Sequence, residues 1–210
     1  MNGTIELRPI IETDLKAVVQ VHKTAFPASA MTQLGEEALR RYYGGLLKGP
    51  YESSCMGAFK GEELLGFCFA GVFRGSDSDF VRRNLLYLTW RVITHPTLTR
   101  NEIIRERLKY ILRIFKPKTR KKSPQAGSSS PGTKRFGILS VAVSSNCQGS
   151  GIGKKLMANA EAEALQRGFT SMRLTVHPEN QQAVVFYEHL GWKRRLHNKA
   201  WEGFMEKELK

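Results

Sequence analysis

One segment, from Val141 to Lys155, constrains what this chain can fold into more than any other. Its sequence passes from a strand pattern into a glycine-rich turn and then into a helical pattern. Between Phe136 and Val143 the apolar residues are nearly continuous, which is typical of a strand covered on both faces. The apolar residues that follow recur at helical spacing, at Leu156, Met157, Ala160 and Ala164. The pattern predicts a central strand that leads through a tight turn into a helix.

The glycines at the start of this predicted helix indicate a site for an anion such as a phosphate group. Glycine lets the backbone adopt positive φ angles and approach a ligand closely. The first N–H groups of a helix also point outward at its positive end. Two better-known phosphate loops do not fit, because a Walker loop would need Ser or Thr where Lys155 stands, and the dinucleotide-binding pattern would need Gly at position 154 or 156.

Two separate motifs resemble the GNAT superfamily of N-acetyltransferases. The pattern Gln148-x-x-Gly151-x-Gly153, after a strand that ends in Ala-Val, resembles the superfamily's acetyl-CoA pyrophosphate loop. The segment from Asn180 to Trp192 resembles its Asn-x-x-Ala-x-x-Phe-Tyr-x-x-x-Gly-Phe segment, with Trp in place of the final Phe. Either motif alone would be a weak signal, but the two in the right order and spacing identify the chain as similar to this superfamily.

The resemblance implies that acetyl-CoA is the cosubstrate and assigns residues to it. The implied cofactor-binding residues are Val141, Val143, Gln148, Gly149, Ser150, Gly151, Ile152, Gly153, Lys154 and Asn180. The backbone of the two valines would bind the pantetheine arm as an added strand, and the loop would hold the pyrophosphate. Asn180 is equally suited to cap its helix. Tyr187 is the implied catalytic acid, which would hydrogen-bond to the leaving thiolate as its charge develops.

The general base is not evident from the sequence. Many relatives carry a carboxylate on the strand before the glycine-rich loop, but the segment from Phe136 to Val141 offers none. Ser140 is a candidate to order a water molecule. His177, which follows a strand, is a second candidate, because histidine is the residue type whose unperturbed pKa lies nearest neutral pH. Cys147 adjoins the loop, but we interpret it as a packing residue, because acetyl transfer in this superfamily goes directly from the thioester to the amine.

Composition agrees with one compact domain. The chain has 210 residues, of which 41% are hydrophobic, so it can bury a substantial core. No run reaches the roughly 18 apolar residues that span a bilayer, and the first residues lack the pattern of a signal peptide. We therefore expect a cytoplasmic protein. The three cysteines are spaced neither as a disulfide framework nor as metal ligands, so we expect no metal site.

The remaining periodicities predict an α/β (α+β) fold. By resemblance it is a GNAT-like mixed, mostly antiparallel sheet flanked by helices. Strands are expected at 4–9, 54–60, 63–73, 136–144 and 171–176, with two more around His197-Asn198. Helices are expected from a Thr13 cap to Ala25, and at 32–47, 151–167 and 181–190.

The stretch 74–135 has no counterpart in the resemblance and is predicted to be a basic helical insertion before the central strand. It contains 16 Lys and Arg against 4 Asp and Glu, a net charge of +12 out of +14 for the whole chain. Phe80 to Ile93 is apolar almost all round, and Asn101 to Phe115 reads as a basic amphipathic helix. The Ser, Pro and Gly residues of 123–132 cannot bury enough surface to order themselves.

Three roles for this insertion remain open. Its helices could cap the acceptor side of the active-site cleft. They could instead lie on an anionic membrane surface through residues 80–122, at the inner face of the membrane, with the basic run attracted by lipid charge. Nucleic acid is a weaker alternative, because aromatic residues are not interleaved with the basic run as base stacking requires.

The resemblance therefore predicts an acetyl-CoA-dependent N-acetyltransferase that acts by direct attack of a primary amine. The mixed aromatic and small residues from Phe26 to Tyr43 favour a small-molecule amine or an amino sugar as the acceptor. A protein or peptide amino group is the nearest alternative. A non-catalytic acyl-CoA-binding module is the alternative from another class.

Overall fold

The structure, a computed structural model, describes residues 4–95, 135–197 and 200–210. These residues form a seven-stranded sheet in the order β1-β2-β3-β4-β5-β7-β6. The strands are β1 (Glu6–Pro9), β2 (Glu52–Lys60), β3 (Glu63–Val72), β4 (Phe136–Val143), β5 (Ser171–Thr175), β6 (Lys193–His197) and β7 (Ala200–Glu208). Only β4 and β5 are parallel among these neighbours, so the predicted mixed and mostly antiparallel sheet is confirmed.

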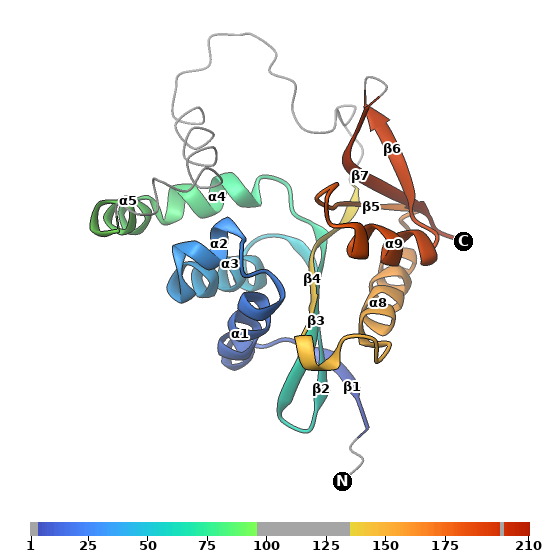
Figure 1. Cartoon of the computed structure of the whole chain (residues 1–210), viewed down its shortest axis with the longest axis horizontal. Helices are drawn as coiled ribbons and strands as arrows, with labels where there is room; N and C mark the ends of the chain where they lie inside the picture. Colours follow the sequence, from blue (N-terminus) through green and yellow to red (C-terminus); the bar gives the residue numbers. More distant parts are fainter. Residues whose placement is uncertain (1–3, 96–134, 198–199) are drawn as a thin grey trace.

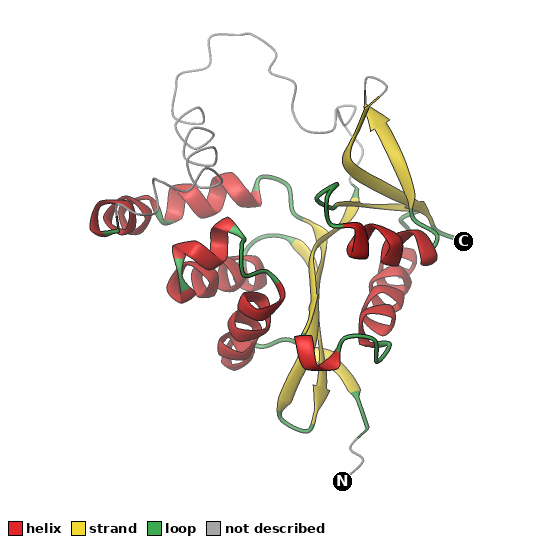
Figure 2. Ribbon diagram, viewed as in Figure 1, coloured by secondary structure: helices red, strands yellow, loops and turns green. Residues whose placement is uncertain are grey.

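Helices cover both faces of the sheet (Figures 1 and 2). On one face lie α1 (Leu15–Ala25), α2 (Ala30–Leu34), α3 (Glu36–Lys48), α4 (Ser76–Arg83) and α5 (Leu85–Thr94). On the other face lie α8 (Ile152–Gln166) and α9 (Gln181–His189). Each face has its own buried core, because β strands alternate their side chains between the two faces. We call these the acceptor face and the cofactor face.

The central strands separate where the site is expected. β4 pairs with β5 over three residues only, from Phe136 opposite Met172 to Ile138 opposite Leu174. On its other edge β4 stays paired with β3 as far as Val143. Within the described residues, the edge of β4 that faces β5 therefore has no strand partner beyond Ile138, which leaves backbone groups free to bind an added chain.

Three helix predictions were wrong in detail. The helix expected at 32–47 is two helices, because Gly35 adopts φ +100° between them, and a Cβ there would stand only 3.0 Å from the Arg91 guanidinium. The apolar segment expected to be one helix is likewise broken at Asn84, whose side chain donates to Phe80 O at 2.9 Å. Thr13 is not a cap, because the turn before α1 is closed by Asp14, whose carboxylate accepts from Ile11 N–H at 2.9 Å.

The described part of the insertion is docked on the acceptor face. Tyr51 Oη donates to Asp79 on α4 at 2.8 Å, and Arg91 on α5 donates to Leu34 O at 3.0 Å. A cavity of about 450 Å³ lies between the start of α3 and α5, and it is lined by Gly35, Glu36, Glu37, Tyr87, Trp90, Arg91, Thr94 and His95. The predicted helix at Asn101–Phe115 and the segment 123–132 lie outside the described residues. No helix among the described residues has the length and apolar character needed to cross a bilayer.

Candidate active site

The start of α8 has free backbone donors of the kind that bind anions. Gly151 is its N-cap residue and no side chain caps the helix. The first bond inside the helix runs from Lys155 N–H to Gly151 O at 3.0 Å, so the N–H groups of the first turn are left without an intrahelical acceptor. These donors and the positive end of the helix dipole are available to a phosphate group.

Charge at this helix end supports the same conclusion. Lys154 and Lys155 lie exposed in the first turn, where no acidic residue stands. Cations at a helix N-terminus oppose its dipole and cost about 0.3–1 kcal/mol each. A bound polyanion would reverse the sign of that interaction, so the arrangement is unfavourable for the empty helix and favourable for a pyrophosphate complex.

The three loop glycines are needed for two reasons, a positive φ at two of them and close packing at the third. Gly149 and Gly151 adopt φ of +79° and +80°, and open space surrounds the position of a Cβ at each, so backbone conformation alone requires glycine. Gly153 has no positive φ, but a Cβ there would stand 3.2 Å from Cζ of Phe186 on α9. Gly153 therefore permits close packing of α8 on α9, which the sequence did not indicate.

The bare edge of β4 begins at an irregularity in the strand. Register with β3 shifts between Phe69 and Ala70, so that Leu139 has no partner in β3. Two consecutive side chains point to the same face there: Leu139 packs into the acceptor-face core, and Ser140 also reaches that face. Beyond it Val141 and Val143 pack on the cofactor face, as partly buried residues. Their side chains serve the core while their backbone borders the gap between β4 and β5.

Tyr187 lies on α9 and packs, partly buried, on the cofactor-face core, and its hydroxyl has no partner among the described residues. Its ring packs against Phe186 and Trp192, with centroids 5.3 and 6.2 Å away. Burial raises the pKa of the Tyr187 phenol well above its usual value, and the neighbouring Cys68 thiol raises the pKa further. The phenol therefore stays protonated at neutral pH and can act as a hydrogen-bond donor.

The other predicted residues have the following placements. Asn180 caps α9, since its Oδ1 accepts from Ala183 N–H at 3.1 Å. Gln148 and Ser150 are exposed in the loop, and Ile152 is buried in the cofactor-face core. Cys147 packs partly buried on the same core. His177 is exposed on the loop after β5, near Glu179. No cluster of His, Cys, Asp and Glu side chains among the described residues is suited to hold a metal ion.

A group of hydrogen-bonded polar residues on the acceptor face was not predicted from the sequence. His22 on α1 and Tyr43 on α3 are buried, and their side chains are 2.7 Å apart between Nδ1 and Oη. Tyr43 Oη also lies 3.0 Å from Ser140 Oγ on β4. Burial lowers the pKa of His22 to about 4, so the imidazole is neutral at neutral pH. The available signal was that both residues occupy the apolar faces of their helices, where a polar side chain needs a buried partner.

Comparison with known proteins identifies the class of protein. A family model described as the acetyltransferase (GNAT) family matches residues 15–192. The chain therefore belongs to the GNAT acetyltransferase family, and it is an acetyl-CoA-dependent acetyltransferase. The uncapped start of α8 and the bare edge of β4 fit that cosubstrate.

Solved structures share the fold. The PaiA N-acetyltransferase of Thermoplasma acidophilum, in complex with coenzyme A, is 17% identical with a TM-score of 0.58, over 98% of this chain and 99% of that one. The ribosomal-protein-S18-alanine N-acetyltransferase of Escherichia coli is 14% identical with a TM-score of 0.55, over 98% and 93%. An aminoglycoside N-acetyltransferase in complex with CoA is 13% identical with a TM-score of 0.58, over 94% and 93%.

Proposed function

We propose that this protein transfers an acetyl group from acetyl-CoA to the primary amine of a small molecule or amino sugar, by direct attack of the amine. The observation that carries the proposal is the short pairing of β4 with β5, which leaves the backbone of Val141 and Val143 without a partner in β5, on a strand whose valines pack on the same core as Tyr187. Acetyl-CoA supplies the activated acetyl thioester. The first turn of α8, with Lys154, would hold its pyrophosphate, and Asn180 would border its pantetheine arm through the amide N–H₂ that the cap leaves free.

Tyr187 acts in this proposal as the hydrogen-bond donor to the leaving sulfur. An ordinary phenol has a pKa of about 10 and an ordinary thiol of about 8.5, and burial raises the phenol further. Full proton transfer to the thiolate is therefore uphill. The hydroxyl would stabilise the charge that develops on sulfur by a hydrogen bond, without giving up its proton.

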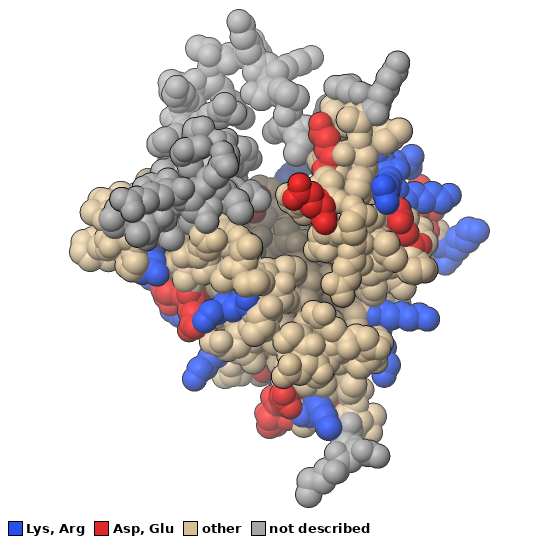
Figure 3. Space-filling model, in the orientation of Figure 1, with Lys and Arg blue, Asp and Glu red and all other residues tan. Residues whose placement is uncertain are grey.

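Charge on the acceptor face favours a single amine over a polyamine or a basic peptide. The two acidic residues at the start of α3 are already engaged, Glu36 with Lys23 and Glu37 with Arg40 and Arg41. The chain as a whole carries +14, which repels a polycation. Figure 3 shows a hollow between the acceptor-face helices and α9 whose visible surface is mostly uncharged, with acidic side chains at its rim on the α9 side. These features support a small acceptor with one reactive amine.

The test is acetyl-CoA turnover, followed by thiol release, against amines of graded charge. The panel would hold a simple primary amine, a neutral amino sugar, its phosphate ester, a polyamine and a peptide with a free α-amino group. We expect the monoamines to be the best acceptors. Turnover confined to the peptide would instead support the protein-acceptor alternative, and acetyl-CoA binding without turnover of any amine would support a binding module.

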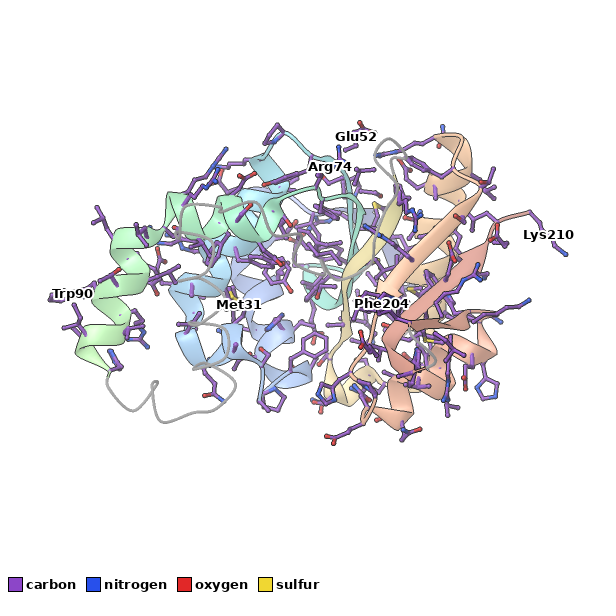
Figure 4. All side chains as sticks on the ribbon, turned by 90° about the horizontal axis from the view of Figure 1, so that it is seen from above. Met31, Glu52, Arg74, Trp90, Phe204 and Lys210 are labelled. Carbon is purple, nitrogen blue, oxygen red and sulfur yellow. The ribbon has the colours of Figure 1, made fainter. Side chains whose placement is uncertain are left out.

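We also propose that the protein is cytoplasmic and associates peripherally with an anionic membrane surface through residues 80–122. The supporting observation is a row of exposed apolar side chains on α5: Leu86, Trp90 and Ile93 are 88, 65 and 68% exposed at helical spacing. Trp90 projects away from the body of the protein (Figure 4). The basic run at 116–122 follows in sequence, and each basic residue near an anionic surface contributes about 1 kcal/mol at most.

Liposome flotation tests this second proposal. Replacement of Leu86, Trp90 and Ile93 by Ser should release the protein from vesicles that contain phosphatidylserine, and so should neutralisation of Lys118, Arg120, Lys121 and Lys122. Leu196→Ser is the matched control, because Leu196 is 69% exposed on β6, far from α5 in sequence. Wild-type protein that ignores acidic vesicles at low ionic strength would rule the proposal out. RNA binding by the same basic run would favour the nucleic-acid alternative.

A further inference from the structure

A continuous chain of hydrogen bonds crosses the acceptor face from Ser140 to the end of α1. Ser140 Oγ lies 3.0 Å from Tyr43 Oη, which lies 2.7 Å from His22 Nδ1. His22 Nε2 lies 3.2 Å from Ser29 Oγ, and Ser29 Oγ lies 3.0 Å from Thr32 Oγ1. Thr32 Oγ1 ends the chain 2.7 Å from the backbone carbonyl of Phe26.

The carbonyl at the far end fixes the direction of the first bonds. A carbonyl oxygen can only accept, so the single hydroxyl hydrogen of Thr32 is donated to Phe26 O. Thr32 Oγ1 must then accept from Ser29, which uses the only hydrogen of Ser29. Ser29 Oγ consequently accepts at its contact with His22, so His22 carries its hydrogen on Nε2.

The same reasoning fixes the direction of the remaining two hydrogen bonds, between His22 and Tyr43 and between Tyr43 and Ser140. With its hydrogen on Nε2, neutral His22 has a bare Nδ1, which accepts from the Tyr43 hydroxyl. Tyr43 has then used its only hydrogen, so the contact with Ser140 must be donated by Ser140. All the hydroxyl hydrogens of the chain point away from β4. Because its only hydrogen is donated to Tyr43, Ser140 Oγ has lone pairs alone to offer to any other group, and it can act there only as an acceptor.

We propose, resting on the acetyltransferase function above, that Ser140 accepts a hydrogen bond from the N–H of the acceptor amine and that Tyr43 and His22 are positioning residues that hold it as an acceptor. Ser140 is half-buried and immediately precedes Val141 at the bare edge of β4. An amine whose N–H points at Ser140 presents its lone pair away from that bond. A hydroxyl free to rotate could instead donate to the amine lone pair, which would block the attack.

The chain orients the amine but does not take its proton. Protonation of the chain would place the charge on His22, since the terminal carbonyl of Phe26 is not basic. Burial lowers the pKa of His22 to about 4, whereas an aliphatic ammonium has a pKa of about 10. Transfer of a proton along the chain is therefore strongly uphill at neutral pH, and a fixed neutral acceptor is what the chain supplies.

Nitrogen-15 NMR of the imidazole tests the direction of the chain without any substrate. We expect His22 at pH 7 to be neutral, with hydrogen on Nε2 and a bare Nδ1. The resonance is identified by its loss in His22→Gln. A hydrogen on Nδ1, or a charged ring, would reverse the chain and overturn the inference, whether or not the protein acetylates amines.

Kinetics test the contact with the amine. Ser140→Ala should lower kcat/KM for the amine about tenfold, the worth of one hydrogen bond, with KM for acetyl-CoA unchanged, and Ser140→Thr should restore most of it. Tyr43→Phe frees the Ser140 hydroxyl, so adding it to Ser140→Ala should cause little further loss. Wild-type protein that acetylates no amine would count against the proposed function. An active enzyme in which Ser140→Ala changes nothing, or in which the two losses multiply, would overturn this inference alone.

Discussion

The two faces of the sheet treat their buried and half-buried polar groups in opposite ways. On the cofactor face, the first N–H groups of α8, the Tyr187 hydroxyl and the Trp192 indole N–H have no partner among the described residues. On the acceptor face, His22 and Tyr43 are each satisfied by two hydrogen bonds. Unsatisfied polar groups cost stability unless a ligand completes them, whereas satisfied ones fix orientation.

This difference separates two tasks within one site. In the proposed function, the free donors of the cofactor face await a ligand that arrives with many acceptor atoms. On the acceptor face, by the inference above, Tyr43 and His22 hold the Ser140 hydroxyl in one orientation, in which its oxygen accepts a hydrogen bond. Five substitutions would break or sharpen this contrast.

The largest effect is expected at the free helix end. Gly151→Asp sets a carboxylate beside the position of the pyrophosphate, and two like charges about 4 Å apart at an effective dielectric of about 20 repel by about 4 kcal/mol. Calorimetric titration should therefore show acetyl-CoA affinity reduced about a thousandfold. Gly168→Asp is the matched control, because Gly168 stands at the other end of the same helix with φ +79° and equally open surroundings. Equal loss of affinity in both variants would attribute the effect to backbone strain.

The next largest effect concerns the satisfied face and pH. The folded-state pKa of His22 is about 4, below an unfolded value of about 6.5. The unfolded chain therefore binds more protons as pH falls, and stability is lost from pH 6.5 down to about 4, by about 3 kcal/mol. His22→Gln keeps an acceptor and a donor but does not titrate. Urea unfolding should show that this variant lacks most of the loss, and an unchanged pH profile would contradict the assignment.

Carboxylates with lowered pKa values affect stability only at a lower pH than His22 does. The pKa values of Asp14, Glu36 and Glu37 are held down by hydrogen bonds from Arg8, Lys23 and Arg40, in that order. Their stabilising contribution is present above their ordinary pKa of about 4 and is lost only as pH falls further. The interval between pH 4.5 and 6.5 therefore reports on His22.

A smaller effect is expected from one tyrosine on each face, the buried Tyr43 and the partly buried Tyr187. Tyr187→Phe removes a hydroxyl that has no partner in the part of the chain that the structure describes, so stability should hardly change while turnover falls about thirtyfold, which is about 2 kcal/mol. Tyr43→Phe leaves His22 Nδ1 buried without a donor and should destabilise the fold by about 1–3 kcal/mol. Steady-state kinetics and urea unfolding on both variants check the contrast. A full rate for Tyr187→Phe with chemistry limiting would reduce Tyr187 to packing.

The cofactor face was predictable because its parts are close in sequence. The loop from Gln148 to Lys154 is continuous, so spacing alone located the turn and the start of the helix, which the structure confirms. The acceptor face was not, because Ser140 lies 97 positions from Tyr43 in the chain and only the packing of α3 on the sheet brings them together. The helix break at Gly35 depends in the same way on Arg91, from a distant helix.

The smallest effect is expected at Trp192, where the sequence departs from the Phe of the superfamily pattern. The ring is 2% exposed and its Nε1–H is buried without a partner among the described residues. Trp192→Phe removes this donor, which offsets the loss of ring volume, so the free energy of unfolding should change by less than about 1 kcal/mol. If the N–H serves the ligand, acetyl-CoA affinity should fall a few-fold in the same variant. Trp192→Leu is the control, since it also removes the donor but leaves a cavity and should cost about 3 kcal/mol. If the Trp192→Phe protein is more stable than wild type and binds acetyl-CoA as tightly, the Trp192 N–H does not donate to the cofactor.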